Sequence, residues 1–218
     1  MSRNQDRLGG VQQPDTSPPP QQGGGGFSFV VPTEFVDLPS QGRFYPEGHP
    51  LHGQDSIEIK QMTAKEEDIL TSRTLLKKGV ALERLISSLI VDNTIDPRTL
   101  LIGDRNAIIV AARVSGYGSD YSTKVQCPAC DTKQTYTFNL YSAHVYHGED
   151  NENLRATINA NGTITCRLPK TQVEVVAKLL TGRDEKSITS IVKSDNQISK
   201  QLETLIVSVN GDSSREAI

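Results

Sequence analysis

The sequence predicts an α+β fold: a central helical cluster, then antiparallel β-hairpins and a C-terminal helix, preceded by a disordered N-terminal arm. Between residues 61 and 118, apolar residues recur with the period of an amphipathic helix. From residue 119 the period changes to that of a strand, and a C-x-x-C knuckle at residues 127–130 separates two alternating segments. Helices and strands in separate blocks are typical of α+β domains.

Residues 1–26 form a Pro/Gly-rich arm. This stretch contains the runs Pro18–Pro20 and Gly23–Gly26 and very few apolar side chains. Such a composition cannot bury enough surface to offset the entropy lost on ordering, so we expect the arm to be disordered.

Residues 27–60 are expected to form an extended segment with short strands. Prolines interrupt every apolar run and exclude long regular elements. Ile57 and Ile59 alternate as a strand would. The side chains that we expect to anchor this segment in the core are Phe35, Val36, Leu38, Phe44 and Tyr45.

Residues 61–118 are expected to form the helical part, with three helices. Thr63 and Glu66 form a capping box for the first, which ends before Gly79. Leu82–Ile90 carries the apolar stripe of the second. Asp104 is the expected N-cap of the third, which ends at Gly116.

Residues 119–180 are expected to form the β-hairpin part with the CxxC knuckle. Segments 121–125 and 135–138 flank the knuckle. A second hairpin is expected around Asn161-Gly162, and residues 172–178 can add a strand.

Residues 181–218 are expected to form a C-terminal helical segment extending past Val209. A capping-box pattern at Ser213 and Glu216 suggests a segment truncated before its last helix, and an accidental S-x-x-E match is the alternative.

Composition excludes several classes of function. The net charge of −3 gives no general attraction to nucleic acid or to anionic lipid. No apolar run approaches the roughly 20 residues of a membrane span, and the first residues lack the apolar core of a signal peptide. An unexported protein in a reducing compartment is the simplest interpretation. Three cysteines then favour metal binding or free thiols over disulfides.

The knuckle predicts half of a zinc site. Cys127 and Cys130 have the spacing at which a tight turn directs two thiolates to one ion. Structural zinc takes four ligands, and the weaker candidates for the others are Cys166, His144 and His147. A complete site within one chain, a metal shared between subunits and a metal-free knuckle remain open. A redox dithiol is disfavoured, because no helix follows the pair.

Catalytic patterns are absent from the sequence. It contains no nucleophile elbow, no phosphate-binding glycine loop and no H-E-x-x-H. His49 and His52 are expected in an exposed turn, and Asp104 with Arg105 is interpreted as a helix cap and a surface pair. No residue pattern therefore supports an enzyme.

Five segments, in this order, resemble the baseplate hub assembly family of T-even-like tailed bacteriophages. They are LPSQGRFYP (38–46), IKQMTAKEEDILTSRTLLKKG (59–79), LLIGDRNAIIVAARVSGYG (100–118), VQCPACDTKQTYTFNL (125–140) and LLTGRDEKSI (179–188). The resemblance covers residues 35–218.

The resemblance implies a non-enzymatic hub subunit or assembly protein of a contractile tail. It implies other phage tail and baseplate proteins as partners, in the host cytoplasm during assembly or in the virion, and leaves a homo-oligomer open. We expect residues 38–46, residues 63–73 and the knuckle to be interaction elements, although packing alone explains Leu38, Phe44 and Tyr45 equally well. The alternative is a zinc-hairpin nucleic-acid-binding module, which is disfavoured because Lys124 and Lys133 are the only nearby cations.

Overall fold

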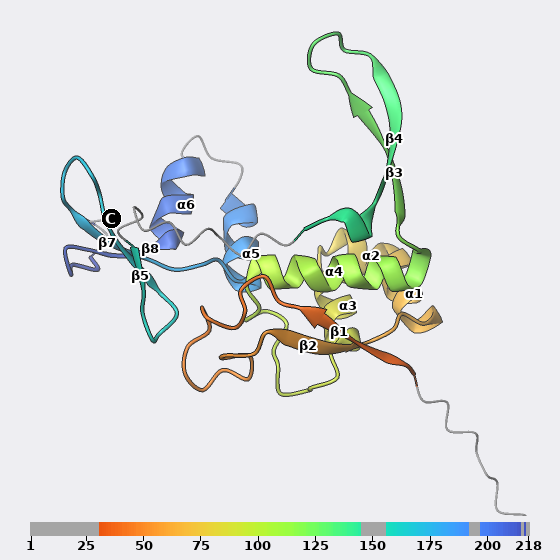
Figure 1. Cartoon of the computed structure of the whole chain (residues 1–218), viewed down its shortest axis with the longest axis horizontal. Helices are drawn as coiled ribbons and strands as arrows, with labels where there is room; N and C mark the ends of the chain where they lie inside the picture. Colours follow the sequence, from red (N-terminus) through yellow and green to blue (C-terminus); the bar gives the residue numbers. More distant parts are fainter. Residues whose placement is uncertain (1–30, 145–155, 192–196, 215, 217–218) are drawn as a thin grey trace, which may run out of the picture. The chain divides into compact units, whose positions relative to one another are not determined.

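The computed structural model describes residues 31–144, 156–191, 197–214 and 216. These residues form helices and antiparallel strands (Figure 1). The described strands make two two-stranded sheets, β1-β2 and β3-β4, and one four-stranded sheet of order β5-β6-β7-β8. The predicted α+β class is confirmed. The expected disordered arm, residues 1–26, lies outside the described residues.

The main core lies between the first sheet and the helices. The elements that build it are β1 (Thr33–Asp37), β2 (Ser56–Lys60), α1 (Ala64–Thr71), α2 (Arg73–Lys77), α3 (Ala81–Leu89) and α4 (Ile102–Tyr117). β2 contributes Ile57 and Ile59, the alternating pair that the sequence predicted. α3 buries one stripe of its surface, formed by Leu85, Ile86 and Leu89. Their positions i, i+1 and i+4 lie on one helical face, so the amphipathic pattern directed this packing.

A buried carboxylate joins the loop after β1 to the longest helix. The Asp104 side chain is fully buried in the first turn of α4. It accepts hydrogen bonds from the Ser40 backbone N–H (2.9 Å), the Ser40 hydroxyl (2.6 Å) and the Tyr45 hydroxyl (2.8 Å). The Tyr45 hydroxyl in turn accepts from the Leu101 N–H (3.1 Å). Burial and the neighbouring Asp104 raise the pKa of Tyr45.

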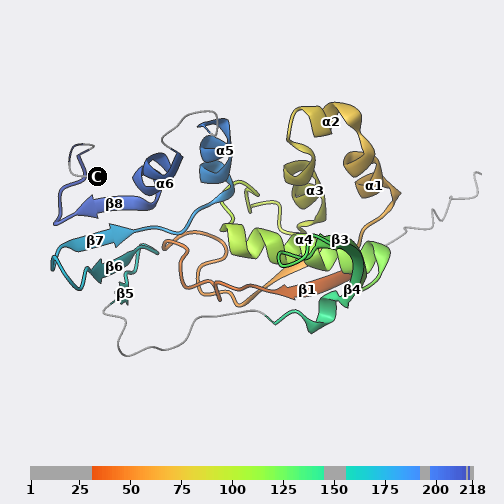
Figure 2. The same ribbon diagram turned by 90° about the horizontal axis from the view of Figure 1, so that it is seen from above.

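The C-terminal part consists of the four-stranded sheet with two helices. Its elements are β5 (Ala156–Ile158), β6 (Ile164–Arg167), β7 (Glu174–Ala177), α5 (Gly182–Ile191), α6 (Gln197–Leu205) and β8 (Ile206–Val209). In Figure 2, α6 lies next to β8 and beside α5. The Ile102 N–H donates to the Leu180 carbonyl (3.0 Å), and the Gly182 N–H donates to the Leu100 carbonyl (3.0 Å). These backbone bonds attach the sheet to the start of α4.

The tight turn of the β5–β6 hairpin packs against the buried loop of residues 38–46. Gly162 has φ +79°, and a Cβ added there would lie 2.2 Å from the Phe44 carbonyl oxygen. Only glycine fits such a backbone conformation at such a close approach. The predicted Asn161-Gly162 turn is therefore also a contact between distant segments.

The two-stranded sheet of β3 and β4 forms an arm at the end of α4 (Figure 1). Its strands are β3 (Asp120–Gln126) and β4 (Lys133–Asn139), followed by the short 3-10 helix η1 (Leu140–Ser142). All residues of β4 are exposed, and β3 has one half-buried position. Arg113 of α4 holds the root of the arm, because its guanidinium donates to the Gly118 carbonyl (2.8 Å) and lies over the Tyr117 ring.

Four expectations about local structure are corrected. Phe35 is not a core anchor, since its side chain is 72% exposed. Asp104 is not the N-cap of α4, because Leu101 holds that position and the carboxylate turns inward. The first predicted helix is two helices divided at Ser72, whose extended backbone ends α1. Residues 206–209, expected on a helix, form β8, because they pair with β7 at the edge of the sheet.

Other expectations are confirmed or lie outside the described residues. Thr63 and Glu66 form the predicted capping box. Glu66 is nevertheless buried, because its carboxylate also accepts from Ser88 of α3 (2.6 Å). The third strand expected after the second hairpin is β7. Most of the predicted end of the C-terminal segment beyond Ser214 is not described.

Replacing Asp104 should destabilise the fold. Asp104→Asn keeps the shape of the side chain but replaces one carboxylate oxygen with an amide NH₂ group. The two carboxylate oxygens accept from three donors, and an NH₂ group cannot accept a hydrogen bond from any of them. We expect the free energy of unfolding to fall by about 2–4 kcal/mol, measured by urea denaturation. Asp68→Asn, an exposed aspartate of α1, is the control and should change it by less than about 0.5 kcal/mol. Equal effects of the two variants would contradict a special role of the buried carboxylate.

Gly162→Ala should be more harmful than an alanine at another glycine with positive φ. Gly53 has φ +69° with nothing within 4 Å of an added Cβ, so Gly53→Ala loses only backbone preference. We expect a cost of about 1 kcal/mol at Gly53 and about 2–4 kcal/mol at Gly162, where the Phe44 backbone must also move. Thermal unfolding of the two variants side by side measures the difference. A smaller loss at Gly162 than at Gly53 would show that the contact with Phe44 is not stabilising.

Candidate functional site

The cysteine knuckle is a well-formed turn at the tip of the arm. The Cys127 N–H donates to the Thr132 carbonyl (3.0 Å), and the Asp131 N–H donates to the Cys127 carbonyl (2.9 Å). Asp131 has φ +56°, the left-handed conformation that reverses the chain after the second cysteine. A hydrogen bond with the Thr132 side chain, with smaller contributions from the Thr132 backbone and Cys127, lowers the pKa of the Cys130 thiol.

The other predicted ligands do not join the knuckle. Cys166 lies on β6, in the four-stranded sheet. His144 is an exposed residue just beyond η1, and His147 lies outside the described residues. Within the part of the chain that the structure describes, no group of three or more His, Cys, Asp or Glu side chains could hold a metal ion. The structure therefore brings together Cys127 and Cys130 alone.

The two faces of the arm differ in character. The antiparallel register pairs Tyr121 with Phe138 and Thr123 with Tyr136, which places the aromatic rings on one face. The Tyr121 and Phe138 ring centroids are 5.3 Å apart. Lys124 and Lys133 occupy the alternate positions and so lie on the opposite face. The arm presents an exposed aromatic face and a separate, weakly basic face.

A second apolar surface is a groove between β1, α4 and the segment after β4. It has a volume of about 460 Å³. Val110, which is 40% exposed, and Tyr141, which is 76% exposed, supply large apolar side chains along it. Along its border, β1 pairs with β2 and with no other described strand.

Glu34 gives this groove an unusual polar feature. Its Oε1 atom is buried and has no hydrogen-bond partner, the only such side-chain atom in the described residues. Buried polar atoms normally have partners, so this oxygen would gain one from an ordered water or from the donor of a bound molecule. The sequence carries a signal for the inward position of Glu34. Glu34 and Val36 are two residues apart, so in a strand they share one side of β1, and this side faces inward. The groove itself could not be predicted, since its walls come from distant segments.

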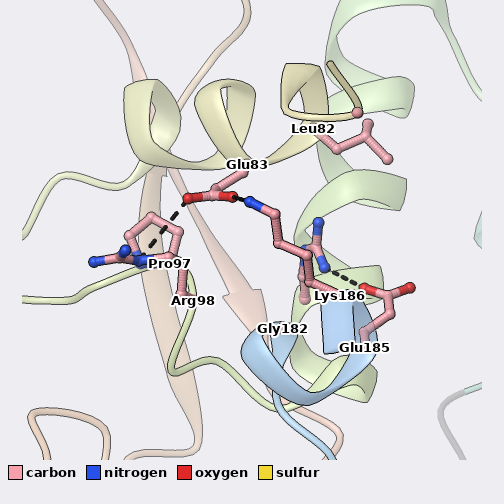
Figure 3. Close-up of a pocket in the computed structure, with 9 residues that line it drawn as sticks. Leu82, Glu83, Pro97, Arg98, Gly182, Glu185 and Lys186 are labelled. Atoms are coloured by element: carbon pink, nitrogen blue, oxygen red, sulfur yellow. Dashed lines mark hydrogen bonds and ion pairs between the residues drawn. The ribbon is translucent and has the colours of Figure 1, made fainter. Parts of the chain in front are cut away.

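A charged crevice lies between α3, the turn at residues 96–98 and α5 (Figure 3). Glu83 is shared by Arg98 (3.9 Å) and Lys186 (3.5 Å), and Arg105 of α4 pairs with Glu185. Each of these charged side chains has an oppositely charged partner, although Glu83 is shared by two cations. The crevice is therefore a polar joint between α3, α4 and α5 rather than a pocket with an unmet charge.

The histidines of the loop before β2 have structural contacts. The His49 ring stacks on Tyr45 with centroids 4.4 Å apart, and its Nε2 lies 2.9 Å from the Thr99 hydroxyl. Partial burial lowers the pKa of His49. The expected exposed turn is thus packed against the core at His49.

None of the described helices is both long enough and apolar enough to cross a membrane.

The fold and these surfaces define a class of protein: an α+β scaffold that carries a projecting arm and an apolar groove. The family model described as T4 bacteriophage base plate protein matches residues 32–214, and the chain belongs to this family. No curated protein and no solved structure matches the chain. The family resemblance seen in the sequence is therefore confirmed for a phage baseplate protein.

Acid should weaken the hydrogen bonds of Asp184 at the start of α5. The Asp184 carboxylate accepts from Lys178 (2.8 Å) and from the Thr181 N–H (2.9 Å). Burial opposes ionisation, but these bonds outweigh it and lower the pKa below its ordinary value of 3.8. A lowered pKa in the folded state means that the stabilisation is complete well above this value and is lost as the pH falls below it.

Asp184→Asn should remove this pH-dependent part of the stability. We expect the variant to be less stable by about 1 kcal/mol at pH 6 and to approach the wild type by pH 3. Urea denaturation across this pH range provides the measurement, with Asp68→Asn as the exposed control. A difference between variant and wild type that stays constant with pH would contradict the assignment.

Proposed function

We propose that the chain is a non-enzymatic structural or assembly protein of the baseplate hub of a contractile-tailed phage. Membership of the baseplate family supports a role among tail proteins. The observation that carries the proposal is the open apolar groove beside β1, with its one buried and unpartnered carboxyl oxygen. A groove of this kind fits a protein partner, because apolar side chains fill it and a donor satisfies Glu34.

The chemistry of the groove defines the partner segment. Val110 and Tyr141 favour apolar side chains, and the Glu34 oxygen and the nearby Asp37 favour a lysine or arginine among them. Another tail or baseplate protein presenting an apolar segment with one cation meets both requirements. Docking would take place in the host cytoplasm during assembly, and the complex would enter the virion if the chain is retained there.

The half-buried character of the C-terminal sheet agrees with a role in assembly. No described residue of β5, β6, β7 or β8 is fully buried. A sheet without a buried face gains stability when another surface covers it. We therefore expect partner contacts there in addition to those in the groove.

The alternative of a zinc-hairpin nucleic-acid-binding module has weaker support. Proteins that bind single strands combine aromatic stacking with cations along the same surface. Here the aromatic rings and the lysines lie on opposite faces of the arm. A baseplate protein–protein role is the better explanation of the exposed rings.

Blocking the groove should abolish partner capture without unfolding the chain. Val110→Glu puts a carboxylate into the groove that Glu34 also lines, and we expect the affinity for the partner to fall at least about tenfold, or about 1.4 kcal/mol. Leu76→Glu is the matched control, because Leu76 of α2 is 54% exposed, Val110 is 40% exposed, and Leu76 does not line the groove. Both tagged full-length variants would be compared with the wild type in infected cells, by mass spectrometry of captured proteins and by circular dichroism.

The expected result is that identified baseplate proteins co-purify with the wild type and with Leu76→Glu, and are lost with Val110→Glu. Retention by Val110→Glu would exclude the groove as the docking site. Capture of nucleic acid alone, in a salt-dependent manner, would overturn the hub proposal and favour the alternative. Turnover of a substrate by the purified chain would overturn the non-enzymatic role.

A further inference from the structure

The knuckle is a preformed half of a metal site on an exposed tip. Two thiols, Cys127 and Cys130, are held in one turn by the backbone bonds of Thr132 and Asp131. Cys130 is exposed and Cys127 is half-buried, so both can be reached from outside. We propose that the arm tips of two copies of this chain bind one Zn²⁺ between them, with Cys127 and Cys130 of each copy as its four ligands. This inference goes beyond the proposed hub role and does not depend on it.

The remaining two ligands cannot come from the nearest candidate in the same chain. The seven residues of β4 separate the knuckle from η1 and His144, a span of roughly 20 Å. Cys166 belongs to a different sheet, where it lies opposite Ala156 and Val175. Zinc bound by thiolates at a structural site takes four ligands in a tetrahedron. The described part of one chain supplies two, and we assign the other two to a second molecule.

A second copy is the occupant that fits the tip. Two identical half-sites related by a twofold axis through the metal supply four thiolates, as two symmetry-related pairs, without further adaptation. The exposed strands of the arm stand clear of the helices in Figure 1, which lets two tips meet without a clash at their bases.

Charge also favours this pairing. A zinc ion with four thiolates carries a charge of about −2. Residues 124–133 hold Lys124, Lys133 and Asp131, and therefore one net positive charge in each tip. Two tips together offset the charge of the metal centre.

The binding step is balanced in protons. Four thiols lose four protons to solvent as four zinc–sulfur bonds form, and no electron is transferred. The Cys130 thiol donates a hydrogen bond to the Thr132 hydroxyl (3.3 Å), which holds the thiol at the tip before it gives up its proton. Contact between two tips alone is small, so the metal supplies most of the energy of pairing.

The test uses the full chain, reduced with a phosphine and freed of metal by a chelator. Zn²⁺ would be titrated while the molar mass is followed by light scattering, and Co²⁺ would replace zinc to report the ligands by its absorption spectrum. We expect about one zinc per two chains, a doubling of the mass, and a tetrahedral thiolate spectrum with cobalt. Excess chelator should restore the monomer.

Cysteine variants identify the ligands. Cys127→Ser and Cys130→Ser should each abolish pairing and the cobalt spectrum, with unchanged circular dichroism because both lie in an exposed tip. Cys166→Ser is the matched control and should pair like the wild type. One zinc per monomer, no zinc bound at micromolar concentration, a dimer that survives the chelator, or loss of pairing in Cys166→Ser would each overturn the proposal. None of these readouts involves another baseplate protein, so failure here leaves the hub test unaffected.

Discussion

The buried carboxylate of Asp104 is the interaction on which the arrangement of this protein depends. It binds the backbone and side chain of Ser40 and the hydroxyl of Tyr45, and so fixes a loop without regular structure against the first turn of α4. Burying a carboxylate is costly unless donors surround it. The loop supplies those donors, which explains why an irregular segment holds one defined conformation.

Segments that resemble the baseplate family in sequence meet at this point in space. LPSQGRFYP provides Ser40 and Tyr45, LLIGDRN provides Asp104, and LLTGRDEKSI attaches next to it through the Leu180 carbonyl and the Gly182 N–H. The expected interaction element at residues 38–46 is thus largely internal, with Leu38 and Tyr45 in the core. Packing, the alternative weighed for these residues, accounts for their burial.

The surfaces left outside this framework are of two kinds. The arm is exposed along most of its length, with aromatic rings on one face and a thiol pair at the tip. The groove beside β1 has apolar walls and a carboxyl oxygen without a partner. A two-stranded hairpin and an uncovered groove are both weakly stabilised in isolation. Both therefore suit a protein that is completed by the molecules it binds.

The sequence by itself determined the elements with local signals. The stripe of α3, the alternation of β2, the capping box at Thr63 and the turn at Gly162 depend on neighbouring residues, and each appears where predicted. The knuckle is local in the same way. These features could be predicted because their period and turn chemistry are set within a few residues.

Only the tertiary structure decided how these elements combine. Asp104 was expected to be a helix cap, but donors from a distant loop draw its carboxylate into the core. Phe35 was expected in the core, but the orientation of β1 exposes it. Residues 206–209 were expected on a helix, but they pair with β7 as a strand. The groove and its unpartnered Glu34 oxygen arise from three separate segments. Burial and pairing between distant residues outweigh local preference, because they involve larger free energies than propensity does.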